Sequence, residues 1–303
     1  MTSANLFNIT TVFYMLSMLA FFVFLAGRNN KVGLSGSILA WAGFAVQTVA
    51  IGLRWKESYA MEMGHAPLEN LYESVIFFAW SIVLRFGLID AKYKYRVIGA
   101  FVMPFALFSI AWAQMFTIAE FVEVKTGSQA LQKLVIMKGD ISPLMPALQS
   151  NWLTYHVITC FLGYAAFTVA CGVSIMYLIK SASESRGTQP AGGVLSLFPP
   201  TKVLDDLNYK AIMIGFPLLT LGIITGAAWA NYAWGTYWSW DPKETWSLIV
   251  WFIYAAFLHA RFTKGWVGKR AAWLSIVGFA ATIFCYLGVN LLLSGLHSYG
   301  AAS

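Results

Sequence analysis

Eight long apolar runs constrain most strongly what this chain can fold into. They lie at about residues 6–26, 34–53, 74–90, 97–118, 154–180, 210–230, 246–262 and 271–293. A helix needs roughly 20 apolar residues to cross the hydrocarbon core of a bilayer, and these runs approach or exceed that length. Charged residues make up only 11% of the chain, against about 25% in an average soluble domain. We therefore predict an all-α integral membrane protein with about eight transmembrane helices, forming a single integral membrane domain over residues 1–303.

The positively charged residues indicate how these helices are oriented. Loops on the cytoplasmic side of a membrane protein carry an excess of Lys and Arg. Fourteen Lys and Arg residues lie in the loops and adjoining run ends that join runs 1–2, 3–4, 5–6 and 7–8, against six in the other loops. We predict that the first set is cytoplasmic, with the Gly-, Pro- and Ser-rich stretch 181–202 as one of its loops, and that both chain termini face outward. The net charge of +7 then reflects membrane topology and not nucleic-acid binding.

The first run favours a retained helix over a cleaved signal peptide. Its first charges, Arg28 and Lys31, come after the apolar stretch, whereas a signal peptide begins with a positive region. The three cysteines, Cys160, Cys171 and Cys285, all lie inside apolar runs. We interpret them as small buried residues, which argues against a thiol redox site or a zinc site.

A tryptophan-rich segment stands between the sixth and seventh runs. Residues 234–246 read W-G-T-Y-W-S-W-D-P-K-E-T-W. Tryptophans often form a belt at the bilayer interface, which remains an alternative for Trp229 and Trp251. Three others, Trp234, Trp238 and Trp240, lie between the runs and cannot all point into headgroups. Indole has a large flat apolar face and one N–H donor, so we predict that residues 229–251 form a platform for a flat apolar ligand such as a porphyrin.

The charged tetrapeptide D-P-K-E within that segment has two interpretations. Asp241, Pro242 and Glu244 match a helix start, with Asp241 as the N-cap, the proline as the first helical residue and the glutamate as its capping-box partner. Asp241 is then a cap that fixes the direction in which the loop leaves, and the alternative is that Asp241 belongs to the cofactor-binding residues. Lys243 is the cation of this loop, and we predict that it pairs with a haem propionate.

Two histidines on the predicted outer face are candidate iron ligands. His156 lies in the first turns of the fifth run, and His297 follows the eighth. Two imidazoles close a six-coordinate haem site. The alternative for each is an ordinary interfacial histidine.

The other two histidines differ in depth. His259 lies 15 residues beyond Glu244, roughly 22 Å below the outer end of its helix. An ionisable side chain within the membrane is a functional candidate by default. Iron ligands at two depths suggest that haem passes from the inner to the outer side. His65, in the outer loop G-H-A-P-L-E-N-L-Y-E-S, is weak evidence by itself.

The sequence resembles the CcsA (ResC) family of System II cytochrome c biogenesis proteins. The resemblance rests on the run from Gly215 to Trp251, which contains the "WWD" motif of haem-handling proteins, and on A-F-L-H-A-R, G-W-V-G-K-R and G-V-N-L-L-L-S-G-L-H-S-Y-G. The loop G-H-A-P-L-E-N-L-Y-E-S is similar as well. The likeness is specific over about residues 205–300 and 64–74.

The resemblance implies a detailed site. It makes His156 and His297 ligands of a haem b on the WWD platform, and His259 part of an inner haem site shared with a histidine of the partner CcsB. Haem b is then a transported substrate and not a permanent cofactor. The pair would present it to the C-x-x-C-H motif of an apocytochrome c, in a bacterial cytoplasmic or thylakoid membrane, with thiol-reducing proteins as helpers. This chain lacks the extension that fuses the two subunits, so a separate CcsB is expected.

Three alternatives remain at this stage. The WWD motif also occurs in the System I proteins CcmC and CcmF, although the length, helix number and closing segment favour CcsA. A b-type electron-transfer cytochrome would hold a permanent haem between histidines on facing helices. A haem exporter without ligase chemistry would use the same site.

Overall fold

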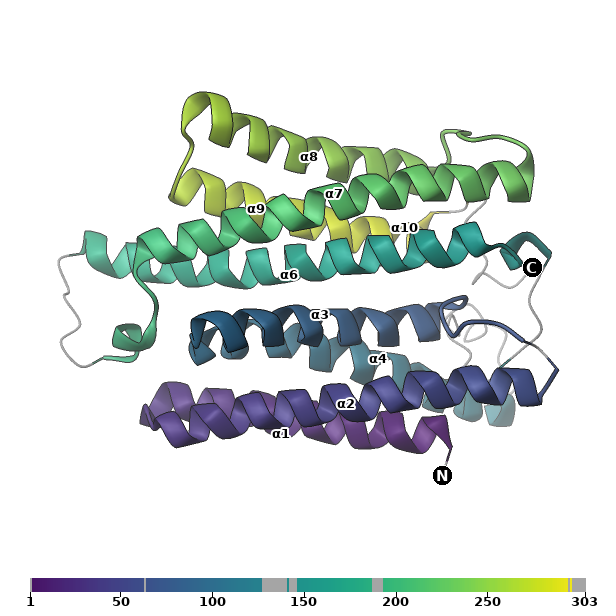
Figure 1. The fold of residues 1–303 in the computed structure, drawn as a ribbon, viewed down its shortest axis with the longest axis horizontal. Coiled ribbons are helices and arrows are strands. Elements are labelled where there is room, and N and C mark those ends of the chain that lie inside the picture. Colours follow the sequence, from purple (N-terminus) through teal and green to yellow (C-terminus); the bar gives the residue numbers. More distant parts are fainter. Residues whose placement is uncertain are drawn as a thin grey trace.

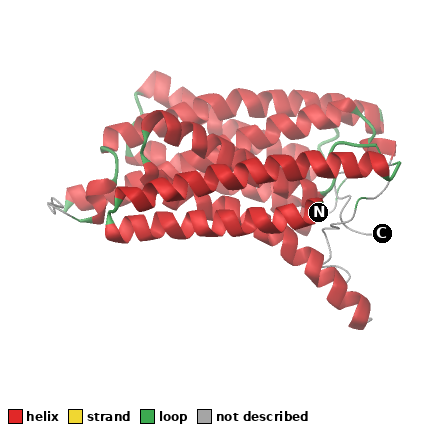
Figure 2. Cartoon of the chain, turned by 60° about the horizontal axis from the view of Figure 1, so that its bottom comes forward, coloured by secondary structure: helices red, strands yellow, loops and turns green. Residues whose placement is uncertain are grey.

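The computed structural model describes residues 2–62, 64–126, 141, 146–186, 193–293 and 295. In this part of the chain eight helices are long and apolar enough to cross a membrane. The same residues form helices and loops only (Figure 2). The prediction of an all-α membrane protein with about eight spans is therefore confirmed.

Seven of the helices are longer than the apolar runs that predict them, whereas the eighth run, 271–293, extends beyond α9. Their bounds are α1 Ser3–Gly27, α2 Asn30–Ala60, α3 Leu71–Tyr93, α4 Gly99–Thr126, α6 Asn151–Ser185, α7 Thr201–Trp234, α8 Pro242–Lys264 and α9 Lys269–Ile283. An apolar run marks only the part of a helix that crosses the hydrocarbon core, whereas capping residues determine where the helix begins. Asn70 is one example, because its side-chain oxygen accepts a hydrogen bond of 2.8 Å from the backbone N–H of Glu73 at the start of α3.

The helices form two groups that meet along α6. Helices α1 to α4 make one group, and α6 packs against α7 and α9 in the other as well as against α3 (Figure 1). Successive helices run in opposite directions, so the loop 235–241, the loop 61–70 and residue 2 all lie at one end of the bundle (Figure 1). We call this the tryptophan end. This alternation matches the predicted one, and the side of the membrane that each end faces stays a prediction.

Arg54 corrects one detail of the charge analysis. The charge analysis includes it among the six Lys and Arg residues of the other loops, but it lies inside α2 and is only 4% exposed. Its Nε donates a 2.7 Å hydrogen bond to Glu73 Oε1 in α3. A buried guanidinium is tolerated when a carboxylate pairs with it, and the pair holds α2 and α3 together at the tryptophan end.

An aromatic cluster joins the two groups of helices. Phe161 of α6 packs edge-on against Tyr286, with ring centroids 5.0 Å apart, and tilted against Phe78 of α3 at 5.7 Å. The Tyr286 hydroxyl lies 2.8 Å from Ser74 Oγ in α3. These contacts hold the halves of α3, α6 and the last span at the tryptophan end against one another.

The last span is not a continuous α-helix. After α9 come a π-helical turn over Phe284–Gly288 and a short helix α10 over Val289–Leu292. The turn directs Cys285 and Tyr286 into the bundle, where both are buried. A π-turn inserted in a span often marks a functional site.

Candidate functional site

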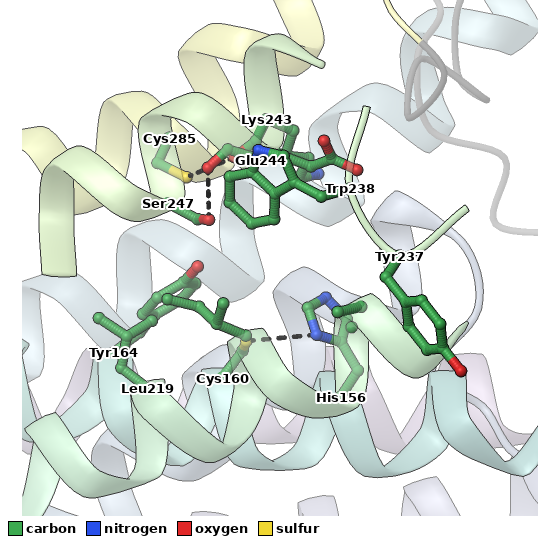
Figure 3. A pocket seen from close by; sticks show the side chains of 13 residues that line it. His156, Cys160, Tyr164, Leu219, Tyr237, Trp238, Lys243, Glu244, Ser247 and Cys285 are labelled. Atoms are coloured by element: carbon green, nitrogen blue, oxygen red, sulfur yellow. Dashed lines mark hydrogen bonds between the residues drawn. The ribbon is translucent and has the colours of Figure 1, made fainter. Parts of the chain in front are cut away.

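A small cavity lies inside the tryptophan end of the bundle (Figure 3). Its volume is about 60 Å³. Three helices, the tryptophan loop and the π-turn supply its walls, which include His156, Cys160, Tyr164, Gly226, Trp238, Lys243 and Cys285. It therefore combines two of the predicted site residues from one segment, Trp238 and Lys243, with His156 from a helix some 80 positions earlier.

His156 is held in a defined orientation on α6. Its Nδ1 lies 2.6 Å from the carbonyl oxygen of Gly222 in α7, and a carbonyl only accepts, so Nδ1 carries the proton. In a neutral imidazole this leaves the lone pair on Nε2, the nitrogen available to a metal ion. The ring also stacks on Trp229, with an angle of 16° between the planes.

Two glycines of α7 create the space for α6 to approach this closely. A Cβ at Gly226 would lie 2.6 Å from His156 Nδ1, and one at Gly222 would overlap Cys160 Sγ. The same close approach continues along the two helices, because a Cβ at Gly163 of α6 would lie 3.1 Å from the carbonyl oxygen of Gly215 in α7. Small residues four apart let transmembrane helices pack backbone to backbone. Here they also leave a notch that receives the histidine.

Trp229 connects His156 to the segment that precedes α6. It is 2% exposed, and its indole N–H donates a 2.9 Å hydrogen bond to the Ala147 carbonyl oxygen in the short 3-10 helix Pro146–Leu148. Trp234 packs against it with ring centroids 4.9 Å apart. The belt interpretation is therefore wrong for Trp229, which lies inside the bundle. Trp251 instead ties α8 to α7 through a 3.0 Å bond to Thr220.

Trp238 and Trp240 occupy different positions on the loop. The Trp238 indole lines the cavity, and its N–H is buried with no hydrogen-bond partner among the described residues. Trp240 is 69% exposed and adopts φ of 61°, a left-handed conformation that is strained for a bulky residue. The two rings meet edge to face at 5.8 Å. A buried orphan donor beside an exposed, strained tryptophan is an arrangement typical of a ligand site.

The capping interpretation of the tetrapeptide is confirmed. The Asp241 carboxylate accepts a 3.1 Å bond from the Lys243 backbone N–H, and Glu244 Oε2 accepts from the Asp241 backbone N–H at 3.2 Å, completing a capping box at the start of α8. Glu244 also accepts from the Ser239 backbone N–H at 2.7 Å, which anchors the loop before the helix. The backbone at Gly295 packs directly against Asp241. Gly295 therefore lies beside the N-cap of α8.

Lys243 points inward to the cavity and not to solvent. Its Nζ donates a 2.8 Å bond to Asn290 Oδ1 in α10. Cys285 lies on the same wall, and Cys160 lies on the opposite one, near His156 (Figure 3). All three cysteines are buried free thiols, as predicted. Glu244 also lines the cavity, but its carboxylate already accepts bonds from Ser239 and Asp241. Lys243 therefore provides a counter-charge for an acidic group of a ligand.

The structure does not bring all predicted site residues together. His259 lies near the opposite end of α8 with its side chain on the exposed surface of the helix, beside the exposed Phe252 and Phe262. Arg261, two residues on, is paired with Asp205 at 2.6 Å. His297 lies outside the described residues. His65 is buried at the tryptophan end, where its Nδ1 lies 3.2 Å from the Ala66 carbonyl oxygen.

Sequence reasoning missed the supporting residues of the cavity. Gly222 and Gly226 form the pattern G-I-I-T-G, whose small-residue spacing was a usable signal for close helix packing. Asn290 carries no signal of its own, because its partner Lys243 lies 47 positions away in the sequence. The cavity is also much smaller than the roughly 300–1,000 Å³ of typical ligand pockets. A porphyrin is therefore too large to be enclosed by this cavity as the structure shows it.

Comparisons with known proteins agree with one another. The sequence matches the family described as cytochrome C assembly protein over residues 68–297. The CcsA cytochrome c biogenesis protein of Guillardia theta is 39% identical, covering 97% of this chain and 95% of that protein. CcsA of Synechococcus elongatus is also 39% identical, with 98% and 97% covered, and CcsA of Porphyra purpurea is 42% identical, with 78% and 79% covered.

A solved structure shares the fold. The cytochrome c haem lyase CcmF matches with a TM-score of 0.65 and 18% identity, covering 94% of this chain and 47% of that chain. At this identity the likeness concerns the fold alone. The sequence relatives decide the family: the chain belongs to the cytochrome c assembly protein family, among the CcsA cytochrome c biogenesis proteins.

Proposed function

We propose that this chain binds haem b at the tryptophan end and presents it for covalent attachment to apocytochrome c. Membership of the CcsA proteins supports a role in cytochrome c biogenesis and haem handling. The observation that carries the specific proposal is the orientation of His156. Its Nδ1 is committed to the Gly222 carbonyl, which leaves Nε2 as the metal-binding nitrogen at the wall of the cavity.

The surrounding residues have distinct roles in this proposal. Trp238, Trp240 and Trp234 contact the porphyrin faces and edges, and the unpartnered Trp238 N–H gains an acceptor when the ligand binds. Lys243 neutralises a propionate from inside the bundle. Asp241 acts indirectly, because its capping box fixes the direction in which the loop enters α8.

His297 is proposed as the second axial ligand. Gly295, two positions before it, packs against Asp241, so the described chain comes close to the tryptophan loop just before His297. Two strong-field imidazoles would hold the iron in six-coordinate form while the vinyl groups stay accessible. Each cysteine thiol of a C-x-x-C-H motif can then add across a vinyl group, with sulfur joining one carbon and hydrogen the other, so the addition involves no net oxidation.

His259 is proposed as part of an inner haem site on the supply route. A histidine on the surface of a transmembrane helix is costly in contact with lipid, so a partner subunit is expected to cover it. We propose CcsB as that partner, with thioether formation a property of the complex. The proposed orientation places the tryptophan end on the outer side of a bacterial cytoplasmic or thylakoid membrane.

The two rival functions are less well supported. A permanent b-type site requires two histidines on facing helices, whereas the described lining of the cavity includes one histidine. An exporter would need the same haem site but no contact with apocytochrome c. The family comparisons favour biogenesis over both.

The test uses the complex with its partner, purified from cells that express an apocytochrome c. We expect His156→Ala and His297→Ala to deplete the haem or to remove the sharp six-coordinate spectrum of the reduced complex. His259→Ala should instead leave the outer site short of haem although both outer ligands remain. Haem staining of cytochrome c should fall in all three variants.

Two results would contradict the proposal. Normal spectra and normal cytochrome c in His156→Ala would remove this residue as a ligand. Normal outer haem and normal cytochrome c in His259→Ala would eliminate the supply route through that residue. Cells that lose the whole protein should still make haem b but should lack covalent cytochrome c, and a different pattern would favour one of the rivals.

A further inference from the structure

A second pocket opens at the tryptophan end, separate from the cavity around His156. Its volume is about 760 Å³. One wall consists of the end of α2 and the loop that follows it, including Trp55, Tyr59, His65 and Glu69. The other wall is the start of α6, including Ser150 and Tyr155. This volume falls within the range of about 300–1,000 Å³ that binds small molecules or a few residues of a peptide.

Glu69 is the unusual residue of this pocket. Its side chain is 8% exposed, and its Oε2 is buried with no hydrogen-bond partner among the described residues. The nearest nitrogen of His65 lies 3.5 Å away and is also 3.2 Å from the Ala66 carbonyl oxygen. Burial, followed by the charge of Glu73, raises the pKa of Glu69 to about 8. A buried carboxyl group without a donor is costly, and a ligand that supplies one removes that cost.

The carboxylate of Glu73, next to Glu69, has the hydrogen-bond donors that Oε2 of Glu69 lacks among the described residues. Glu73, one turn further along, accepts from Arg54 Nε at 2.7 Å and from the Glu69 backbone N–H at 3.1 Å. This carboxylate is thus satisfied within the protein. Glu69 faces the pocket instead, where its carboxyl group can receive a donor from outside.

The remaining lining favours a positively charged group. The described lining contains two acids, Glu62 and Glu69, and no Lys or Arg. Trp55, Tyr59 and Tyr155 are exposed aromatic residues. Aromatic faces together with carboxylates bind ammonium and guanidinium groups. The cavity around His156, by contrast, contains Lys243 together with Glu244, whose carboxylate is already occupied by the backbone N–H groups of Ser239 and Asp241, so that cavity favours an acidic group.

The two sites are joined by the first turns of α6. Thr154 and Tyr155 line the second pocket, and the next residue, His156, lines the cavity. Leu148 also lines the second pocket, and its neighbour Ala147 accepts the bond from Trp229, which stacks on His156. A chain seated in the second pocket therefore lies beside the proposed haem site.

We propose that the second pocket binds the apocytochrome polypeptide through a basic side chain near its C-x-x-C-H motif, seated against Glu69 and the aromatic residues Trp55, Tyr59 and Tyr155. This inference rests on the proposed function, which supplies a polypeptide substrate at this end of the bundle. Seating one basic residue here would hold the two thiols close to the haem vinyl groups.

The test measures peptide binding to the complex of this chain with its partner. Two fluorescent peptides are used, each with a C-x-x-C-H motif whose cysteines are replaced by serine, one with a flanking lysine and one with glutamine in its place. Lysine-peptide binding should weaken roughly 10-fold in Glu69→Gln, since the bound ammonium group favours the ionised form of Glu69 and glutamine cannot form that charge-assisted bond. Tyr155→Ala, at an exposed position, should weaken it too. The glutamine peptide should bind weakly and equally to all variants.

Glu184→Gln provides the matched control, because this carboxylate is exposed at the opposite end of α6. It should bind both peptides as the unchanged complex does. The absorption of bound haem should be normal in Glu69→Gln, which separates this proposal from the haem site. Lysine-peptide binding unaffected by Glu69→Gln and Tyr155→Ala would overturn the proposal. So would loss of the partner subunit from Glu69→Gln with peptide binding unchanged, because the pocket would then be a subunit interface.

Discussion

The Nδ1 of His156 lies 2.6 Å from the backbone carbonyl oxygen of Gly222. This bond joins α6 to α7 and determines which ring nitrogen remains for a metal ion. A backbone carbonyl cannot be removed by substitution, but the notch that permits the bond can be filled. The role of this bond is therefore testable at Gly226, which lines the cavity but has no side chain that could bind a ligand.

Gly226→Ala should disturb His156 without changing any polar group. The added Cβ would lie 2.6 Å from Nδ1, so the ring must shift. We expect a roughly 10- to 100-fold loss of haem retention or of cytochrome c maturation, the usual effect of displacing the support of a metal ligand. The measurement is the absorption spectrum of the reduced complex. Gly52→Ala in α2, where a Cβ has open space, is the control and should have a normal spectrum.

Lys243→Met should lower haem retention by roughly 10-fold or more, because a buried cation no longer meets the propionate. Lys243→Arg should retain more haem than Lys243→Met. Asn290→Ala removes the 2.8 Å partner of Lys243 but leaves the charge, so we expect most haem to remain. Haem content per protein, measured after purification, distinguishes the roles. Equal losses in Lys243→Met and Asn290→Ala would show that the lysine only ties α8 to α10.

Asp241→Asn should preserve most activity, since asparagine also caps helices well. Asp241→Ala should lose about 1 kcal/mol of stability at the start of α8 and more of the activity. Thermal unfolding of the purified complex and haem staining of cytochrome c measure the two effects. If both variants lose activity equally, the carboxylate charge matters and not the cap.

Fusions to a phosphatase that is active only outside the cytoplasm test the orientation. A fusion after residue 297 should be active, and one within residues 181–202 should be inactive, because the positively charged loops lie on the cytoplasmic side. The reversed result would place the tryptophan end in the cytoplasm, where the proposed attachment of haem outside the cell membrane could not occur.

Stability at the second pocket should fall as the pH rises. Glu69 keeps its proton in the folded protein up to a pKa of about 8, while its ordinary value is 4.5. Between these values the unfolded chain loses the proton and the folded chain keeps it, so ionisation favours unfolding. Melting temperatures from pH 5 to pH 9 should decline less steeply in Glu69→Gln than in the unchanged protein. Parallel curves would show that Glu69 ionises normally despite its neighbours His65, Glu73 and Arg54.

The fold was predictable to the extent that lipid imposes it. An apolar run of sufficient length has few alternatives to a membrane-spanning helix, so all eight runs correspond to helices. Their ends were not predictable from hydropathy, because capping residues such as Asn70 determine them. The buried pair between Arg54 and Glu73 was missed for a related reason: charge alone suggested a loop.

The site was predictable only where its residues adjoin in sequence. The capping box of Asp241 and Glu244 follows from four consecutive letters, and it is confirmed. The bond between Lys243 and Asn290 joins residues 47 positions apart, and nothing in either segment indicates it. The notch at Gly226 could be predicted only if it were known that α6, and not another helix, lies against α7. Packing partners, and not residue types, were the missing information.

The π-helical turn at Phe284–Gly288 has a consequence for how relatives of this protein are aligned. In an α-helix each residue advances by about 100° around the axis, so one residue accommodated in a π-turn rotates everything beyond it by about that angle. A helical-wheel projection started at Lys269 therefore assigns Asn290 to the wrong face, although the structure directs it toward Lys243. Relatives with one residue more or fewer in this turn should be aligned by the helix face that each residue occupies and not by sequence position alone. Otherwise position 290 would be equated with a residue on the lipid-facing side of the helix.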